Sequence, residues 1–479
     1  MDTATLALVG VVIVVAALLS GVVERTRFPQ VALFLLLGLV IGVSGFGLVD
    51  FRLDSKILET IATLGLVLVL FTDAVSVDIR EVRRHRTLVR LVLGPGTLVT
   101  AALIAVSAWG LLGLAPGPAA ILGAALASTD PVMMRGLLRG GAGDVPAAAR
   151  QVLALESGLN DLVLLPIVLV AMALLGGNET GNWGRAALNL FLVGPGAGIA
   201  VGFVGVVLLD RMRRWVGVRR DYESLYALGL AFTAYAVAEA AHGSGFLGAF
   251  AAGLTIAASD AELCDCFLDF GQAAAEMFLL FTFVAFGSSL IWTGLAGITW
   301  RGLAFAVLAL GLRSAVLAIA LPRRTLDARS RRLIVWFGPR GLSTLLLVLL
   351  PVFAGLPGAD RLFAPAALVV LLSVVAHGGA LMLTRRKPPG GRALPLATPP
   401  AAPPEQSPVE RGDRITLAEL KEIEARGERV VLLDVRKDRA WDDSDQKAQG
   451  AVRLPPDNAA PRAAELALPR HAWLVAYCA

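Results

Sequence analysis

The sequence predicts an all-α polytopic membrane protein with a small α/β segment at its C-terminal end. Hydrophobic residues make up 56% of the 479 residues and charged residues only 17%, whereas a soluble globular domain has roughly 25% charged residues. The charge is also uneven, because about 13% of residues 1–384 are charged against about 32% of residues 385–479. These observations exclude a single soluble domain and place a membrane domain before a soluble one.

Thirteen apolar runs are long enough, or nearly so, to cross a bilayer core of about 30 Å as helices. They lie at 4–23, 30–44, 58–78, 88–112, 118–138, 151–175, 186–209, 222–241, 246–259, 271–290, 302–321, 332–354 and 362–384. The segments after odd-numbered runs contain 23 Lys and Arg residues, and those after even-numbered runs contain five. By the positive-inside rule, the N-terminus lies outside and the C-terminus in the cytoplasm. Loop orientation accounts for the net charge of +5, so no nucleic-acid partner is expected.

The chain divides into three parts by composition. Residues 1–385 form the transmembrane domain, residues 386–412 are a Pro/Ala-rich, semi-rigid linker, and residues 413–479 form the soluble segment. In the soluble segment, a helix is predicted at 415–426 and strands at 430–435 and 473–477, which indicates an α/β arrangement. Three cysteines are too few for a disulfide framework.

The fifth run contains Ser128-Thr129-Asp130-Pro131. Proline removes a backbone donor and clashes with the carbonyl four residues back, so the helix is expected to loosen near Thr129. This leaves carbonyl groups free beside a carboxylate. Broken helices of this kind form the ion sites of secondary transporters.

The sixth run contains Glu156-Ser157-Gly158-Leu159-Asn160-Asp161. Helical spacing places Ser157 and Asp161 on one face, an oxygen-rich patch suited to a hard monovalent cation. Glu156 and Asn160 share the neighbouring face. Glu156 needs a cationic partner, which Arg340 of the twelfth run can supply.

Arg340 lies in Gly338-Pro339-Arg340-Gly341, which should interrupt the twelfth run. Two interrupted runs at corresponding positions are the pattern of an inverted-repeat transporter. Runs one to six would match runs eight to thirteen, so that the fifth pairs with the twelfth.

These residues and motifs resemble those of sodium/proton antiporters of the NhaP-like group, within the cation/proton antiporter 1 family. The resemblance covers about 380 residues and implies that Asp161 binds a cation and a proton by turns. It also implies that Asp130, Thr129 and Ser157 complete the cation site. Asn160 stands where electrogenic relatives have a second aspartate, which implies one-for-one electroneutral exchange of H⁺ for Na⁺, with Li⁺ or K⁺ as other candidate cations.

The resemblance also assigns supporting roles. Glu156 and Arg340 would form a structural ion pair, and Asp73 and Arg313 would lie near the cation path as a possible gate. It further implies a homodimer in the cytoplasmic (inner) membrane, elevator-type alternating access and no cofactor. His377, near the last run, is interpreted as a packing residue.

The C-terminal segment resembles a rhodanese domain. Leu433-Asp434-Val435-Arg436 resembles its early strand, and Ala476-Tyr477-Cys478 resembles the strand that leads to the persulfide-forming cysteine. The catalytic loop of that family continues beyond the cysteine, so the domain is expected to be incomplete and without sulfurtransferase activity.

Three alternatives differ in substrate or class. The first is K⁺/H⁺ exchange, and the second is a transporter regulated by persulfide chemistry at Cys478. The third, an ion channel, is disfavoured because a carboxylate that holds one ion at a time suits saturable exchange.

Overall fold

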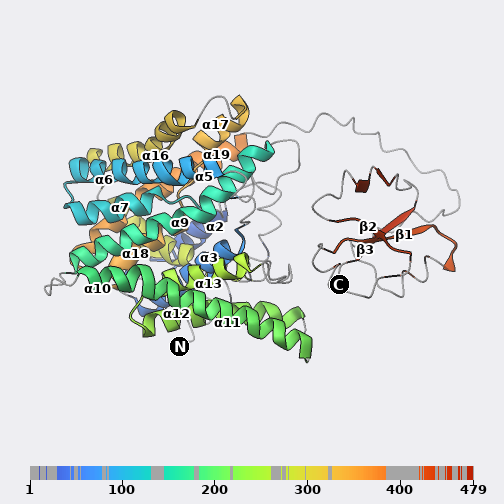
Figure 1. Ribbon diagram of the computed structural model, residues 1–479. Coiled ribbons are helices and arrows are strands. Elements are labelled where there is room, and N and C mark those ends of the chain that lie inside the picture. The colour runs from blue at the N-terminus through green and yellow to red at the C-terminus, as the bar shows by residue number, and fades with distance from the viewer. Residues whose placement is uncertain are drawn as a thin grey trace, which may run out of the picture. The chain divides into compact units, whose positions relative to one another are not determined.

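The computed structural model separates into two compact units, Met1–Lys387 and Pro388–Ala479 (Figure 1). Each unit is considered by itself. The structure describes residues 10, 14, 18, 30–43, 45–47, 52–53, 55–77, 82, 86–130, 145–176, 183–215, 220–259, 271, 274, 277–278, 280–296, 298–321, 326–383, 420, 423, 425–436, 441, 448, 450–455, 462–463, 465–466 and 472–477.

All the regular secondary structure that is described in the first unit is helical. Its first half contains α2 (Gln30–Ile41), α3 (Lys56–Val75), α5 (Arg86–Leu91), η1 (Val92–Thr97), α6 (Leu98–Leu112), α7 (Pro116–Ala127), α9 (Ala147–Leu175), α10 (Trp183–Leu188), η2 (Asn189–Val193) and α11 (Gly194–Trp215). Its second half contains α12 (Arg220–Ala240), α13 (Gly245–Ala258), η3 (Phe286–Leu290), α15 (Ile291–Ala296), α16 (Trp300–Ala320), α17 (Ala328–Trp336), α18 (Leu342–Phe353), η4 (Ala359–Leu362) and α19 (Phe363–Leu383).

The helices agree with the predicted runs. Every run from 30–44 to 362–384 contains described helical residues, and residues 10, 14 and 18 of the first run are helical. By length and composition, six described helices could cross a membrane, and four shorter ones are also apolar. Two of the three cysteines, Cys264 and Cys266, lie outside the described residues.

Three of the helical segments have a π-helical turn. The segment η1 contains Pro95 and joins α5 to α6 in one helix, Arg86–Leu112. Proline lacks the N–H group that an α-helix needs at this point, and the wider turn accommodates it. The Thr97 hydroxyl donates to the carbonyl oxygen of Val92, five residues back, at 3.1 Å.

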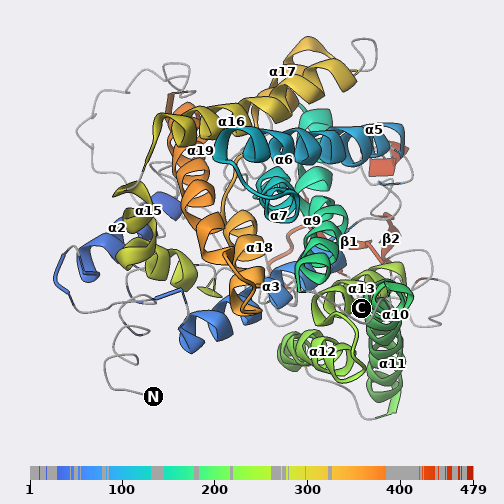
Figure 2. The same cartoon turned by 90° about the vertical axis from the view of Figure 1, so that its left-hand side faces the viewer.

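Helix α7 lies at the centre of the unit, between α6, α9 and α18 (Figure 2). Its residues from Ile121 to Ala127 are all buried. Elsewhere glycine allows close packing: a Cβ atom on Gly198 of α11 would lie 2.0 Å from the carbonyl oxygen of Gly248 on α13. Small residues at such crossings are typical of helices that pack within membranes.

The second unit contains a three-stranded parallel sheet in the order β2-β1-β3, formed by β1 (Val430–Asp434), β2 (Val452–Arg453) and β3 (Trp473–Tyr477). The predicted strands at 430–435 and 473–477 therefore form. Residues 420, 423 and 425, within the predicted helix, are helical. Cys478 and the linker lie outside the described residues.

Candidate functional site

The site forms beside α9, where two non-helical segments meet, here called the first and second interruptions: residues 128–130 after α7 and residues 337–341 between α17 and α18. Helix α7 ends at Ala127, and Ser128 is extended, with φ −63° and ψ 138°. The break lies one residue before the predicted position at Thr129. Pro131 explains it, because the ring of a proline in a continuing helix would clash with the carbonyl group of residue 127.

The second interruption separates α17 from α18. Helix α17 ends at Trp336 and α18 begins at Leu342, with five non-helical residues between them. The two interruptions contact each other directly, since the Asp130 N–H donates to the Pro339 carbonyl oxygen at 2.9 Å. Gly341 is needed here, because a Cβ atom on it would lie only 1.8 Å from Asp130 Oδ2.

The polar side chains in the central turns of α9 lie beside the place where the two interruptions meet, which is called the crossing below. Glu156 and Asp161 are each only 4% exposed. The Ser128 hydroxyl donates to Asp161 Oδ1 at 2.7 Å, and Ser343, at the start of α18, is close enough to interact with the same carboxyl group. Asp130 is close enough to act electrostatically on the Asp161 carboxyl group.

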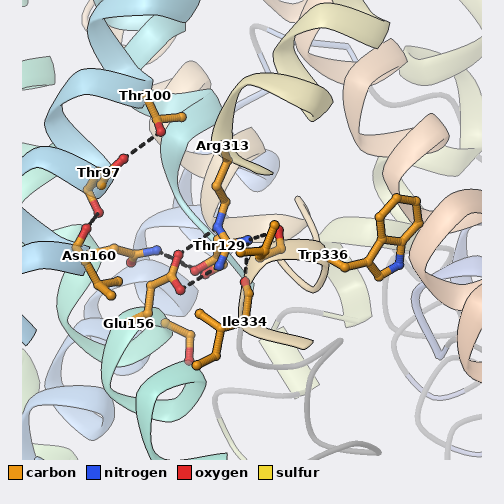
Figure 3. A network of polar contacts seen from close by, with 12 residues as sticks. Thr97, Thr100, Thr129, Glu156, Asn160, Arg313, Ile334 and Trp336 are labelled. Atoms are coloured by element: carbon orange, nitrogen blue, oxygen red, sulfur yellow. Dashed lines mark hydrogen bonds and ion pairs between the residues drawn. The ribbon is translucent and has the colours of Figure 1, made fainter. Parts of the chain in front are cut away.

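Asn160 connects α9 to the first interruption. Its Nδ2 donates to Thr129 Oγ1 at 2.8 Å (Figure 3). Its Oδ1 is buried and has no hydrogen-bond donor among the described residues. A buried oxygen in that state is available to a water molecule or a cation. Ser157, also buried, turns its hydroxyl to the Ala154 carbonyl oxygen of its own helix, at 3.2 Å.

The predicted ion pair of Glu156 with Arg340 is corrected by the structure, which pairs Glu156 with Arg313 of α16. Arg313 Nε donates to Oε1 at 2.8 Å and Nη2 donates to Oε2 at 2.6 Å, in a bidentate arrangement (Figure 3). Nη1 of Arg313 donates to the Ile334 carbonyl oxygen at 3.2 Å. Gly338 allows this approach, since its Cβ would lie 2.4 Å from the Arg313 Cζ atom.

Arg340 instead stabilises the C-terminal end of α7. Its Nη1 donates to the carbonyl oxygens of Ala127 at 2.6 Å and Ser128 at 2.9 Å. The last carbonyl groups of a helix have no intrahelical donor and form the negative end of its dipole. Nη1 of Arg340 thus supplies a hydrogen-bond donor, and the guanidinium group a positive charge, at this helix end.

The remaining predicted residues are less central. Asp73 lies half-buried in the last turn of α3, which packs against both α9 and α18. Arg313 was expected near the cation path as a gate. Its described nitrogen atoms donate to Glu156 and to backbone carbonyl groups. Cys478 lies outside the described residues.

The structure therefore brings together Asp161, Asp130, Thr129 and Asn160, and it adds two hydroxyl groups that the sequence did not assign to the site. These are Ser128 and Ser343, each beside a helix end. Small polar residues that flank an interrupted run are a usable signal, because their side chains can reach both the backbone and a ligand.

Buried carboxylates and hydroxyl groups at helix ends, within a helical membrane protein, are typical of ion transporters as a class. Residues 11–385 match the family described as sodium/hydrogen exchanger, transmembrane. This match covers most of the chain, which therefore belongs to the sodium/hydrogen exchanger family.

Two relatives are named as transporters and not as enzymes. The K⁺/H⁺ antiporter NhaP2 of Shewanella sp. (strain MR-4) is 27% identical over 374 residues, which are 78% of this chain and 65% of the relative. The K⁺/H⁺ antiporter NhaP of Alkalimonas amylolytica is 24% identical over 448 residues, which are 92% of this chain and 74% of the relative. The chain thus spans a little under two thirds of the length of the first relative.

The fold is similar to that of the sodium proton antiporter MjNhaP1 from Methanocaldococcus jannaschii. The TM-score is 0.64 and the identity is 20%, and the similarity covers 78% of this chain and 98% of that one. This likeness establishes the fold of the helical unit.

Proposed function

We propose that the protein exchanges a monovalent cation for a proton across the inner membrane, with Asp161 as the group that both ligands share. The observation that carries this proposal is the set of partners around Asp161. The carboxyl group is buried, yet its described partners are the hydroxyl groups of Ser128 and Ser343. Burial favours the neutral form of a carboxyl group, whereas a bound cation favours the ionised form, so proton and cation compete.

The cation would take oxygen ligands, as hard cations do. Asp161, Asp130 and Thr129 are the candidate ligands that the crossing gathers, with Asn160 Oδ1 as a further buried oxygen. Ser157 remains a candidate, provided that its hydroxyl turns away from its own helix.

The proposed stoichiometry is one for one. Asn160 cannot titrate, so it adds hydrogen bonds without adding a second proton. A site that carries one proton in one direction and one cation in the other moves no net charge. When Asp161 is unloaded and ionised, moving it past an apolar barrier is unfavourable, which keeps the exchange coupled.

Alternating access would follow the elevator scheme implied by the resemblance. The interrupted runs five and twelve would belong to two inverted repeats and would move together against a fixed scaffold in a homodimer. The contact of Asp130 with Pro339 supports the joint movement, because it ties the two interruptions together. The N-terminus would lie outside the cell.

Exchange in proteoliposomes tests the proposal. We expect Asp161→Asn to abolish cation-dependent dissipation of a pH gradient, and Asp130→Asn to reduce it. Asp327→Asn is the matched control: Asp327 caps the exposed start of α17 at its Arg329 and Ser330 amides, and Asn is an equally good cap. Normal exchange by the Asp161 variant would exclude Asp161 as the shared group.

A K⁺/H⁺ exchanger is the second candidate, because both curated relatives above carry that name. Na⁺ and K⁺ take the same oxygen ligands, so the choice depends on the size of the site. Comparing Li⁺, Na⁺ and K⁺ in the same proteoliposome assay separates the two, since the preferred cation has the lowest apparent KM.

We further propose that the second unit is rhodanese-like and regulates transport. Its support is a parallel sheet whose strand β3 ends at Tyr477, directly before Cys478 in the sequence. A persulfide at Cys478 would then be the signal. If the proposal is right, polysulfide changes the exchange rate of the wild type and not that of Cys478→Ser. Equal responses contradict it.

A further inference from the structure

Two polar residues of α19 contact the interruption between α17 and α18. Ser373 and His377 are one helical turn apart, so they lie on the same face of α19. Ser373 Oγ accepts the backbone N–H of Arg340 at 2.7 Å. His377 Nε2 lies 3.3 Å from the carbonyl oxygen of Trp336, the last residue of α17.

Each ring nitrogen of His377 faces a carbonyl oxygen: Nε2 faces that of Trp336 at 3.3 Å, and Nδ1 faces that of Ser373 at 3.1 Å. Nδ1 also lies 3.1 Å from Ser373 Oγ. With the proton on Nε2, the neutral ring donates to Trp336 and accepts the Ser373 hydroxyl proton, whereas with the proton on Nδ1 it makes only the bond to the Ser373 carbonyl oxygen. We therefore assign the proton to Nε2, the tautomer with two hydrogen bonds. The lone pairs of the Ser373 hydroxyl oxygen accept the Arg340 N–H. The Arg340 N–H has this acceptor in either tautomer.

These contacts meet a need of the interrupted backbone. Non-helical backbone at membrane depth requires partners supplied by neighbouring elements. Arg340 and Ser373 are at most 1% exposed, and His377 is 7% exposed. The His377 ring also packs edge-on against Phe337, the first non-helical residue, with ring centres 5.7 Å apart.

The chain of contacts leads to the carboxylate of the candidate site. Ser373 fixes the backbone of Arg340, whose guanidinium group holds the carbonyl oxygens of Ala127 and Ser128. Ser128 in turn donates its hydroxyl to Asp161. Movement of Arg340 would therefore displace the hydroxyl group that orients Asp161.

We infer that Ser373 and His377 are positioning residues for the Asp161 site, acting through Arg340 and Ser128. This inference rests on the proposed exchange function for its effect on transport. It assigns to α19 a specific part in the site, and it replaces the interpretation of His377 as a packing residue alone.

Ser373→Thr and Ser373→Val form a matched pair, because the two side chains have nearly the same shape and only threonine keeps the hydroxyl group. Any overpacking is then common to both. We expect the apparent KM for the cation to be about tenfold higher in the valine variant than in the threonine variant, as for loss of one buried hydrogen bond. Maximal rates per protein molecule should agree within roughly threefold.

His377→Phe separates hydrogen bonding from packing, since phenylalanine keeps a ring against Phe337 but offers no nitrogen. The inference predicts a higher apparent KM in this variant, whereas a packing role predicts wild-type transport. Ser288→Ala is the control for removal of a buried helical hydroxyl elsewhere: Ser288 is fully buried, and its hydroxyl donates to the Ala285 carbonyl oxygen. It should leave KM unchanged.

Hydrogen exchange of the peptide 337–341 tests whether Ser373 holds the Arg340 backbone, and it does not depend on transport. The Arg340 amide should exchange faster in Ser373→Val than in Ser373→Thr. Equal exchange rates, or equal KM values in the matched pair, overturn the inference. Absence of cation exchange in the wild type would instead overturn the proposed function, and hydrogen exchange would still decide whether Ser373 holds the interruption.

Discussion

Two buried carboxylates on α9, only five residues apart, have opposite surroundings. Glu156 is fixed by a bidentate guanidinium group from Arg313, whereas the Asp161 carboxylate receives the hydroxyl proton of Ser128. Both are equally buried. A carboxylate with its own internal cation has no electrostatic need for another, while one supported by hydroxyl groups retains that need. The comparison separates the structural acid from the proposed transport acid.

Another buried carboxylate, in the second unit, follows the pattern of Glu156. Asp434 is fully buried and pairs with Arg436, with Nη2 2.6 Å from Oδ2. Tyr477 donates its hydroxyl to the same oxygen at 2.6 Å. Glu156 and Asp434 are thus both paired with arginine.

The largest expected effect comes from removing the partner of Glu156. Arg313→Met strands a buried charge, so the free energy of unfolding should fall by about 3–5 kcal/mol. Adding Glu156→Leu should restore most of the loss, because replacing a whole buried pair by apolar groups is often nearly neutral. Thermal unfolding in detergent measures both.

Thermal unfolding of Arg340→Met is the control that tests which arginine is the partner of Glu156. A double-mutant cycle should give a larger coupling energy for Glu156 with Arg313 than for Glu156 with Arg340. The reverse order would show that the pairing in the structure is not the one that stabilises the protein.

The next largest effect is expected from adding a charge next to Asp161. Asn160→Asp should add a second titratable carboxylate and make exchange electrogenic. A potential of 100 mV would then drive a cation gradient of up to about 50-fold, from roughly 2.3 kcal/mol per charge. Cation accumulation driven by a potential alone, at equal pH on both sides, measures this. Accumulation by the wild type would contradict one-for-one exchange.

A smaller effect is expected for the hydroxyl that orients Asp161. Ser128→Ala should raise the apparent KM for the cation by about three- to tenfold, since one hydrogen bond is lost. Ser157→Ala should change KM less, because that hydroxyl faces its own helix. A larger effect at Ser157 would indicate that its side chain turns to the cation during transport.

The smallest effect on transport is expected in the second unit. The Arg436 guanidinium, hydrogen-bonded to Asp434, holds the pKa of that carboxyl well below its ordinary value of 3.8. A lowered pKa contributes stability above the ordinary value, which is lost as the pH falls through the folded-state pKa. The contribution is therefore complete at both pH 5 and pH 7.

Asp434→Asn should consequently weaken amide protection of β1–β3 equally at pH 5 and pH 7, once intrinsic exchange rates are corrected for. Hydrogen exchange on the whole protein measures it, with transport as a parallel readout. Wild-type protection in the variant would show that the pair adds nothing to the stability of the sheet.

Much of the architecture could be predicted from the sequence. Apolar runs gave the helices, Pro131 gave the end of α7 to within one residue, and Gly338-Pro339 gave the interruption before α18. The grouping of Asp161 with Asp130 and Thr129 was implied by the resemblance to NhaP-like antiporters and not by helical spacing. The partner of Glu156 was predicted wrongly, because two buried arginines were available and spacing along α9 gives no information about α16.

Hydropathy, helix breaks and the position of acids within apolar runs are local properties of the chain, so the amino-acid sequence determined them. Which arginine neutralises Glu156, and which hydroxyl supports Asp161, was decided only in the tertiary structure. The Arg313–Glu156 pair joins residues 157 positions apart, and the Arg340 contact with Ala127 joins residues 213 positions apart. Contacts at such separations depend on how whole helices pack, and that is a property of the complete fold.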